Sequence, residues 1–222
     1  MTVPAAYDAH ADWYDAYIAG PAAGYTERKD DLLRDLLGVG AGVCLDLCCG
    51  TGRHAQTLRG LGWTPVGIDV SRGQLRHAVG RLPVAAGDAI ALPVADRSLP
   101  ALVCVLAHTD LPDYAGVLRE VARTLRPGGR FVHIGVHPCF IGAFADWSDR
   151  SRVVVDTRYT DRSQRFDAWC PTGVRARVGA WHVPLADLLN GVTATGLRLV
   201  QVAETGPGGL PDMFGLLAVK PS

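Results

Sequence analysis

The sequence has no excess of charge of either sign: its 222 residues carry 22 Lys and Arg against 22 Asp and Glu. General nucleic-acid binders and polybasic membrane-surface proteins need a cationic face, so this balance argues against both classes. Hydrophobic residues make up 48% of the chain and charged residues 20%, as in a folded globular protein rather than a disordered one. The length fits one domain, residues 1–222, with room for an insertion.

Two kinds of segment are also missing. The first twenty residues contain acidic side chains and no basic start followed by an apolar block, so they do not resemble a secretory signal. No run approaches the roughly 20 apolar residues that a helix needs to cross a bilayer. We therefore expect a cytoplasmic protein without a membrane partner.

Paired cysteine motifs are absent as well. The six cysteines form no C-x-x-C pair and mostly lie inside apolar runs: Cys44, Cys48, Cys49, Cys104, Cys139 and Cys170. Buried thiols in a reducing compartment fit this pattern better than a disulfide framework or a zinc site. We expect no bound metal.

The chain does contain a regular alternation of short apolar runs and helical patterns. Strands are expected at 43–47, 64–68, 82–86, 101–106 and 130–136, and helices at 53–61, 73–81 and 115–125. This alternation predicts a parallel α/β sheet with helices on both faces, a fold that binds ligands at the carboxyl ends of its strands. A helix at 185–194 and two strands at 197–203 and 213–219 follow, and these strands are expected to pair antiparallel.

Residues 140–180 break this rhythm. They are rich in Trp, Arg and Asp and have weak periodicity, so we expect an inserted segment that lies over the strand ends and shapes a substrate pocket. Its aromatic residues indicate an apolar or aromatic substrate: Trp147, Tyr159, Phe166 and Trp169.

A glycine turn after the first strand carries the strongest signal. The residues Gly50-Thr51-Gly52-Arg53-His54-Ala55 match G-x-G-x-x-A, which lets the backbone approach a ligand closely while N–H groups point outward. Asp69 follows at the end of the second strand, where a carboxylate can accept both hydroxyl protons of a ribose. Together these features predict an adenosine-type cofactor, although Asp69 could instead be only a helix cap.

Two further acids distinguish between cofactors. Asp46 lies at the end of the first strand, four residues before Gly50, where its charge would repel a diphosphate and attract a cation. The alternative is that Asp46 accepts a hydrogen bond from the turn backbone. Asp88 ends the third strand, where it could accept a hydrogen bond from an adenine amino group or belong to an ordinary Gly-Asp turn. Acids at three successive strand ends favour S-adenosylmethionine, which carries a sulfonium and no phosphate.

Four stretches in combination resemble a class I S-adenosylmethionine-dependent methyltransferase of the small-molecule type (methyltransferase domain 11/25-like). LDLCCGTGRHA resembles the cofactor loop of that family, GIDVS its ribose-binding strand end, AGDA its adenine-contact acid, and LREVARTLRPGGRFV its helix, Pro-Gly-Gly turn and fifth strand. The resemblance implies a Rossmann-like, doubly wound seven-stranded sheet, mostly parallel with one antiparallel strand near the C-terminus. It also implies methyl transfer from S-adenosylmethionine to an O, N or C nucleophile of a small molecule, with S-adenosylhomocysteine as product.

The sequence departs from this family at two places. Cys48 stands where the loop usually has its first glycine, and we expect its thiol to be accommodated at a negative backbone angle with cofactor binding retained. Leu99-Pro100 replaces the usual aromatic-Asp pair before the fourth strand, where we expect no catalytic consequence.

The residues expected at the cofactor share positions in the glycine turn or just after a strand. They are Asp46, Cys48, Gly50, Thr51, Gly52, Asp69 and Asp88, the apolar neighbours Val70 and Ala89, and Cys104, Val105 and Leu106, whose carbonyls could receive the ammonium group. The resemblance adds Tyr14, from an N-terminal segment (residues 1–40) that would cover the cofactor. The alternative is an amphipathic helix on the sheet edge, with Tyr7, Trp13, Tyr14 and Tyr17 packed against it.

Catalytic candidates are few, because methyl transfer requires a base only when the acceptor is protonated. His108 and His137 are the candidates, each just past a strand end. The alternative for both is a histidine that holds a loop through a backbone hydrogen bond. His54 and His182 look structural, and His133 looks like a core residue.

Two other functions fit parts of the sequence. One is a non-catalytic module that binds S-adenosylmethionine or S-adenosylhomocysteine. The other is an NAD(P)-dependent oxidoreductase, which Asp46 disfavours and which lacks a well-placed Tyr-x-x-x-Lys pair, since Tyr25 and Lys29 precede the glycine turn. A monomer and a homodimer are both compatible with the sequence.

Overall fold

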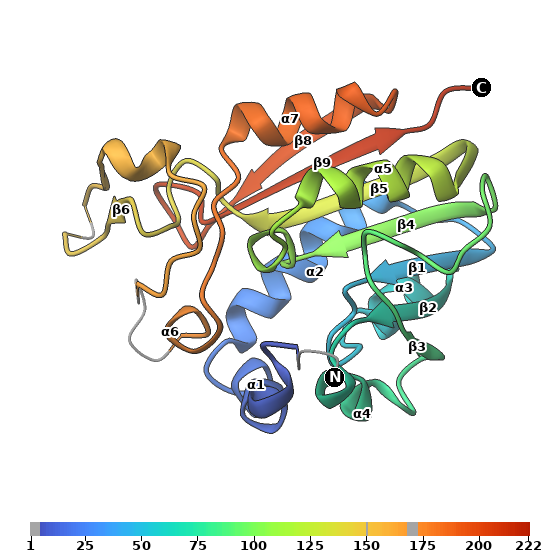
Figure 1. Cartoon of the computed structure of the whole chain (residues 1–222), viewed down its shortest axis with the longest axis horizontal. Helices are drawn as coiled ribbons and strands as arrows, with labels where there is room; N and C mark the ends of the chain where they lie inside the picture. The colour runs from blue at the N-terminus through green and yellow to red at the C-terminus, as the bar shows by residue number, and fades with distance from the viewer. Residues whose placement is uncertain (1–4, 150, 168–172) are drawn as a thin grey trace.

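The computed structural model describes residues 5–149, 151–167 and 173–222. Seven strands form one sheet in the order β3-β2-β1-β4-β5-β9-β8 (Figure 1). They are β1 (Val43–Leu47), β2 (Thr64–Asp69), β3 (Val84–Ala86), β4 (Leu99–Val105), β5 (Leu125–Val136), β8 (Arg198–Thr205) and β9 (Met213–Val219). In this described sheet β9 runs in the direction opposite to the other six strands, and its pairings with β5 and β8 are antiparallel. The predicted seven-stranded sheet with one antiparallel strand is confirmed.

Helices cover both faces of the sheet (Figure 1). The helices α5 (Tyr114–Thr124) and α7 (Leu185–Ala194) lie on one face, and α2 (Ala23–Leu37) and α3 (Ala55–Gly60) lie on the other. The helix α4 (Arg72–Ala78) packs beside β2 and β3. Doubly covered strands need apolar side chains on both faces, which explains the unbroken apolar run that forms β4.

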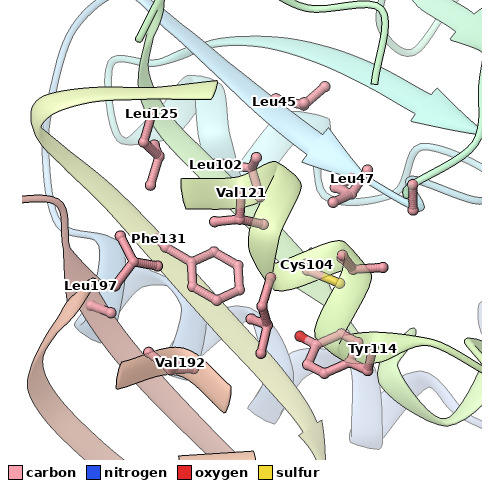
Figure 2. Packing of buried hydrophobic residues seen from close by; sticks show 14 of the residues in the cluster. Leu45, Leu47, Leu102, Cys104, Tyr114, Val121, Leu125, Phe131, Val192 and Leu197 are labelled. Atoms are coloured by element: carbon pink, nitrogen blue, oxygen red, sulfur yellow. The ribbon is translucent and has the colours of Figure 1, made fainter. Parts of the chain in front are cut away.

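The larger core cluster lies between the sheet and the helices α5 and α7. Phe131 of β5 is fully buried there, with Val121 of α5, Val192 of α7 and Leu197 around it (Figure 2). Val117, Leu118 and Val121 form the face of α5 that enters this cluster. Leu102 of β4 belongs to the same cluster, whereas its neighbours in the strand face the cluster beneath α2 and α3.

Element types agree with the sequence expectation more closely than element ends do. The helix expected at 53–61 covers only Ala55–Gly60, and the one expected at 73–81 covers Arg72–Ala78. The Arg-Pro-Gly-Gly segment, expected as a turn before the fifth strand, lies within β5. Leu125 pairs with Leu99 and Arg130 pairs with Ala101, so the intervening residues form a bulge. Gly128 supplies the positive φ of 74° that this bulge contains.

The described residues between 140 and 180 lie at the carboxyl edge of the parallel strands (Figure 1). They contain a two-stranded hairpin of β6 (Ala145–Asp146) and β7 (Val154–Val155), the turn η3 (Thr157–Thr160) and the short helix α6 (Arg175–Val178). Trp169 and Cys170 lie outside the described residues. Before the sheet, the turn η1 (Asp8–His10) and the helix α1 (Ala11–Ala19) precede α2. Within the described ranges, every helix is too short or too polar to cross a bilayer.

Candidate functional site

The turn after β1 has an unusual backbone. Cys48, Gly50 and Gly52 all have positive φ, at 57°, 53° and 74°. Glycine adopts this left-handed region without penalty, whereas a residue with a Cβ atom loses roughly 1–2 kcal/mol there. The expectation of a negative angle at Cys48 is wrong: the turn needs the glycine conformation, and the cysteine adopts it under strain. A hydrogen bond with Cys104 and burial raise the pKa of the Cys48 thiol well above its usual value.

Asp69 fixes this turn to the end of β2. Its Oδ2 accepts a hydrogen bond from the Gly50 N–H at 2.8 Å, and its Oδ1 accepts one from the Ser71 N–H at 2.7 Å. Ser71, not Asp69, is the N-cap of α4, because the Ser71 hydroxyl accepts from the Gln74 N–H. Burial raises the pKa of Asp69 to about 6, although both hydrogen bonds act in the opposite direction. A desolvated carboxylate is therefore held at the carboxyl edge of the sheet.

A cavity of about 310 Å³, here called the first cavity, opens beside this carboxylate. Its wall includes the following residues from the set expected at the cofactor: Tyr14, Cys48, Gly50, Thr51, Asp69, Val70, Val105 and Leu106. They come from α1, the glycine turn and the ends of β2 and β4. The sheet edge thus brings together most of the expected cofactor site in one space.

The other expected cofactor residues are not among the residues that line the first cavity. The Asp46 carboxylate is fully buried and lies 3.1 Å and 3.2 Å from Nδ1 of His54. Asp88 is exposed, and its Oδ1 accepts from the Ile90 N–H. Ala89 and Cys104 are buried in the core. Gly52 has a packing role, because a Cβ atom there would lie 2.5 Å from Leu82.

Other wall residues were not expected at the site. Lys29 of α2 is buried, and its Nζ lies 3.2 Å from Asp30. His54, which the sequence suggests is structural, lines the first cavity, and its Nδ1 lies 3.1 Å from Oδ2 of the buried Asp46. Oε1 of Gln74 also lies at this wall, buried and without a hydrogen-bond partner among the described residues. Lys29 and Gln74 lie outside the quoted motifs, and His54 stands at a variable position of the glycine motif, so the sequence does not mark these three residues as cavity-lining.

The turn η1 and the helix α1 are attached to the glycine turn and to the start of α4. Asp15 of α1 accepts hydrogen bonds from Arg81 at 2.8 Å and from Arg53 at 3.1 Å. The same Arg81 nitrogen donates to the Thr51 carbonyl at 2.7 Å. These hydrogen bonds, first from Arg81 and then from Arg53, hold the pKa of Asp15 well below its usual value. Asp8 adds a second attachment by accepting from Ser71 and from the Gly73 N–H.

The two histidines expected as bases do not reach the first cavity. His108 is buried against His133 and Tyr114 and lines a separate space of about 20 Å³. Burial lowers the pKa of His108 well below its usual value. His137 is buried too, with Nε2 2.6 Å from Glu204 and Nδ1 accepting from the Cys139 N–H. His137 has the loop-holding contacts of its alternative, and a catalytic role for either histidine stays a prediction.

A second cavity of about 330 Å³ adjoins the first. The two share four wall residues, namely Tyr7, Tyr14, Ile18 and Leu106. The rest of the second wall is mostly aromatic and aliphatic and includes Tyr17, Tyr25, Val136 and Ile141, together with the charged Arg175 and Asp212. Arg175 is paired with Asp110, which also accepts a hydrogen bond from the Tyr7 hydroxyl at 3.1 Å. An adenosine-sized ligand and a second, mostly apolar molecule could therefore lie side by side.

The cavity walls offer carboxylate, amide, hydroxyl and ammonium groups. Among the residues that the structure describes, no three His, Cys, Asp or Glu side chains come close enough together to hold a metal ion.

Comparisons with known proteins identify what this arrangement is similar to. Residues 44–129 match the family model described as methyltransferase domain. The chain is 38% identical to methyltransferase GfsG of Streptomyces halstedii over 129 residues, which cover 53% of this chain and 46% of that protein. It is 36% identical to demethylmenaquinone methyltransferase of Mycolicibacterium paratuberculosis over 132 residues, which cover 59% of this chain and 57% of that protein. The chain thus spans about half the length of these relatives.

A solved structure extends the likeness to the fold. An S-adenosylmethionine-dependent methyltransferase from Mesorhizobium loti superposes with a TM-score of 0.72, covering 86% of this chain and 96% of that one at 24% identity. This chain therefore shares the fold of that protein, a mostly parallel seven-stranded sheet flanked by helices.

Proposed function

We propose that the chain transfers a methyl group from S-adenosylmethionine to a small molecule, because residues 44–129 match the methyltransferase-domain family model and the fold is that of class I S-adenosylmethionine-dependent methyltransferases. The nucleophile on that acceptor is an O, N or C atom. One observation carries the proposal: the desolvated Asp69 carboxylate, held at 2.8 Å from the glycine-turn N–H of Gly50, faces a cavity large enough for a nucleoside.

The side chains of the first cavity fit the chemistry of this cofactor. Asp69 would accept the ribose hydroxyls, and the exposed Val70 side chain would provide an apolar surface for the adenine ring. The buried Lys29 ammonium would pair with the methionine carboxylate. Oε1 of Gln74, which has no hydrogen-bond partner among the described residues, would accept a hydrogen bond from a donor on the ligand. When bound, S-adenosylmethionine supplies an electrophilic methyl group and a good leaving group.

The second cavity fits the position of the methyl acceptor. It meets the first cavity at four shared residues, so an acceptor in it would lie next to the cofactor. Tyr14 is one of the four, and its ring would give a sulfonium a favourable cation–π environment. The role of the chain is then to align the two molecules and to exclude water, which is the main contribution that a protein makes to such a displacement.

Ligand-dependent unfolding tests the proposal. S-adenosylhomocysteine should raise the Tm of the protein, whereas NADH should leave it unchanged. The variant Asp69→Ala should lose this shift, and Asp35→Ala, on the exposed face of α2, should retain it. A Tm rise with NADH alone would contradict the proposal.

Turnover separates an enzyme from a binding module. Radiolabelled methyl groups from S-adenosylmethionine should pass to a component of a small-molecule extract, and Asp69→Ala should abolish the transfer. Binding of S-adenosylhomocysteine without any transfer across extracts of varied origin would favour the non-catalytic module instead.

A further inference from the structure

Three polar atoms beside the second cavity are buried and have no hydrogen-bond partner among the described residues. They are the Tyr25 hydroxyl, Nε of Arg28 and Oδ1 of Asp212. Tyr25 and Asp212 belong to the cavity wall. Arg28 joins them, because its Nη2 lies 2.6 Å from Oδ2 of Asp212 and its guanidinium lies 5.4 Å from the centre of the Tyr25 ring. We refer to these three residues as the polar end of the second cavity.

The topology of the sheet brings this polar end together. Asp212 directly precedes β9, and an antiparallel strand begins at the edge where its parallel neighbours end, as the pairing of Met213 with Val136 shows. Tyr25 and Arg28 lie three residues apart on α2 and therefore share one face of that helix. Residues 184 positions apart in the sequence thus meet at the site.

The three atoms that have no hydrogen-bond partner among the described residues indicate that a ligand group binds there. A buried polar atom without a hydrogen bond destabilises the folded protein by about 1–3 kcal/mol, and native proteins contain few such atoms. Oδ1 of Asp212 is an acceptor, so its partner must carry an O–H or N–H group. Burial raises the pKa of Asp212, and the neighbouring Arg28 acts in the opposite direction. The Asp212 carboxylate would repel an anionic group of a ligand at this position.

The remainder of the wall indicates the polarity and the size of the rest of the ligand. The rings of Tyr14, Tyr17 and Tyr25 and the aliphatic side chains of Ile18 and Ile141 form a mostly apolar lining. Arg175, the other charged wall residue, already binds Asp110 and the Gly179 carbonyl. The cavity volume of about 330 Å³ lies within the range of small-molecule sites.

We propose that the second cavity binds an uncharged or cationic aromatic acceptor whose O–H or N–H group donates a hydrogen bond to Asp212 and contacts the Tyr25 hydroxyl. This inference rests on the proposed function for the identity of the ligand as a methyl acceptor. The binding preference itself depends only on the cavity. Asp212 and Tyr25 are then the residues that determine acceptor specificity.

A pair of probes that differ in one hydrogen-bond donor tests this preference. The measurement is the dissociation constant of 2-naphthol and of 2-methoxynaphthalene, by fluorescence, with and without saturating S-adenosylhomocysteine. The wild-type protein should bind 2-naphthol about tenfold more tightly, because only this probe supplies the donor. Asp212→Ala should weaken 2-naphthol binding by about the same factor and leave 2-methoxynaphthalene within about threefold.

Two further variants make the result specific. Tyr25→Phe, which keeps the ring, should reduce the preference for 2-naphthol, and Asp35→Ala, on the exposed face of the same helix, should keep it. Equal affinities in the wild-type protein, no binding of either probe, or an unchanged preference in both Asp212→Ala and Tyr25→Phe would overturn the inference. Failure of S-adenosylhomocysteine to bind would instead count against the proposed function, since the probes are also measured without it.

Discussion

Cys48 occupies a backbone conformation that suits glycine, with a φ of 57°. Variants at this position can show how much of its effect on the free energy of unfolding comes from backbone strain and how much from packing of the thiol. We expect Cys48→Gly to have a free energy of unfolding about 1 kcal/mol higher than Cys48→Ala, because both lose the thiol and only alanine keeps the strained Cβ. Cys49 has no positive φ, so there the order should reverse, with alanine the more stable. Urea unfolding of the four variants measures this. Equal stabilities of Cys48→Gly and Cys48→Ala would show that the turn carries no such strain.

Asp69 should make ligand binding depend on pH. Its pKa of about 6 lies above the ordinary value, so the folded protein takes up this proton more readily than the unfolded chain. The contribution of Asp69 to the free energy of unfolding therefore decreases as the pH rises from about 4 to about 6. Ribose hydroxyls require the ionised carboxylate, so affinity for S-adenosylhomocysteine should fall by up to about tenfold per pH unit below 6.

Calorimetric titration between pH 5 and pH 8 checks this dependence. Asp69→Asn should bind weakly with a nearly flat profile over the same range. Parallel profiles for the wild-type protein and Asp69→Asn would assign the pH dependence to another group.

The contrast between Asp69 and Asp212 shows which site residues a sequence can reveal. Asp69 follows a glycine turn at a fixed spacing along a strand, so a local pattern marks it. Asp212 reaches its position through the pairing of β9 with β5 and meets Arg28 of α2 only in three dimensions. His108 was expected at the correct sheet edge, but position along a strand does not determine which way a side chain points after the strand ends. Leu106, with a φ of 59°, redirects the chain there.

At the scale of elements, α1 is held against the glycine turn mainly through Asp15. Asp15→Asn should lower the free energy of unfolding by about 1–2 kcal/mol, since its charged hydrogen bonds to Arg53 and Arg81 are only partly exposed. Because the pKa of Asp15 is lowered, this stabilisation should be present above pH 4 and be lost as the pH falls further.

The same helix offers a control. Asp12 pairs with His77 at 2.7 Å, but its side chain is 78% exposed, so Asp12→Asn should change stability by less than about 0.5 kcal/mol. Both variants can be compared by urea unfolding at pH 7. If Asp15→Asn lowered the free energy of unfolding as little as Asp12→Asn, the hydrogen bonds between α1 and the turn would not contribute to stability.

The order and type of the sheet elements were predictable because each has a local cause: apolar runs for buried strands and a 3.6-residue period for helices. Element ends were less predictable. The bulge in β5 arises from pairing with β4, and Arg-Pro-Gly-Gly by itself is typical of a turn. The contacts of the described residues between 140 and 180 could not be predicted, because weak periodicity leaves the structure of such a segment to long-range packing.

For the molecule as a whole, ligand binding should slow exchange in parts of the chain that are far apart in sequence. The first cavity is bounded by residues of the N-terminal segment, such as Tyr7 and Tyr14, and by Val178 and Trp181 near α6. Arg177 of α6 also lies 4.0 Å from the centre of the Trp13 ring, so the two segments contact each other. S-adenosylhomocysteine should therefore protect amides of both segments.

Hydrogen–deuterium exchange measures this protection. Residues 5–19 and 173–181 should exchange more slowly with ligand, while β8, at the far edge of the sheet, should change little. Asp69→Ala provides the unliganded control. Protection confined to the glycine turn would mean that the two segments do not respond to the ligand.

The position of β9 between β5 and β8 has a consequence for how the chain folds as it is made. In the described sheet β8 pairs with β9 alone, yet β8 precedes β9 along the chain. A ribosome adds residues at about 5–20 per second. The β8 segment therefore has no strand to pair with until β9 has emerged and paired with β5. Asp212 emerges just ahead of β9, so the second cavity is completed in the same late step that closes the sheet.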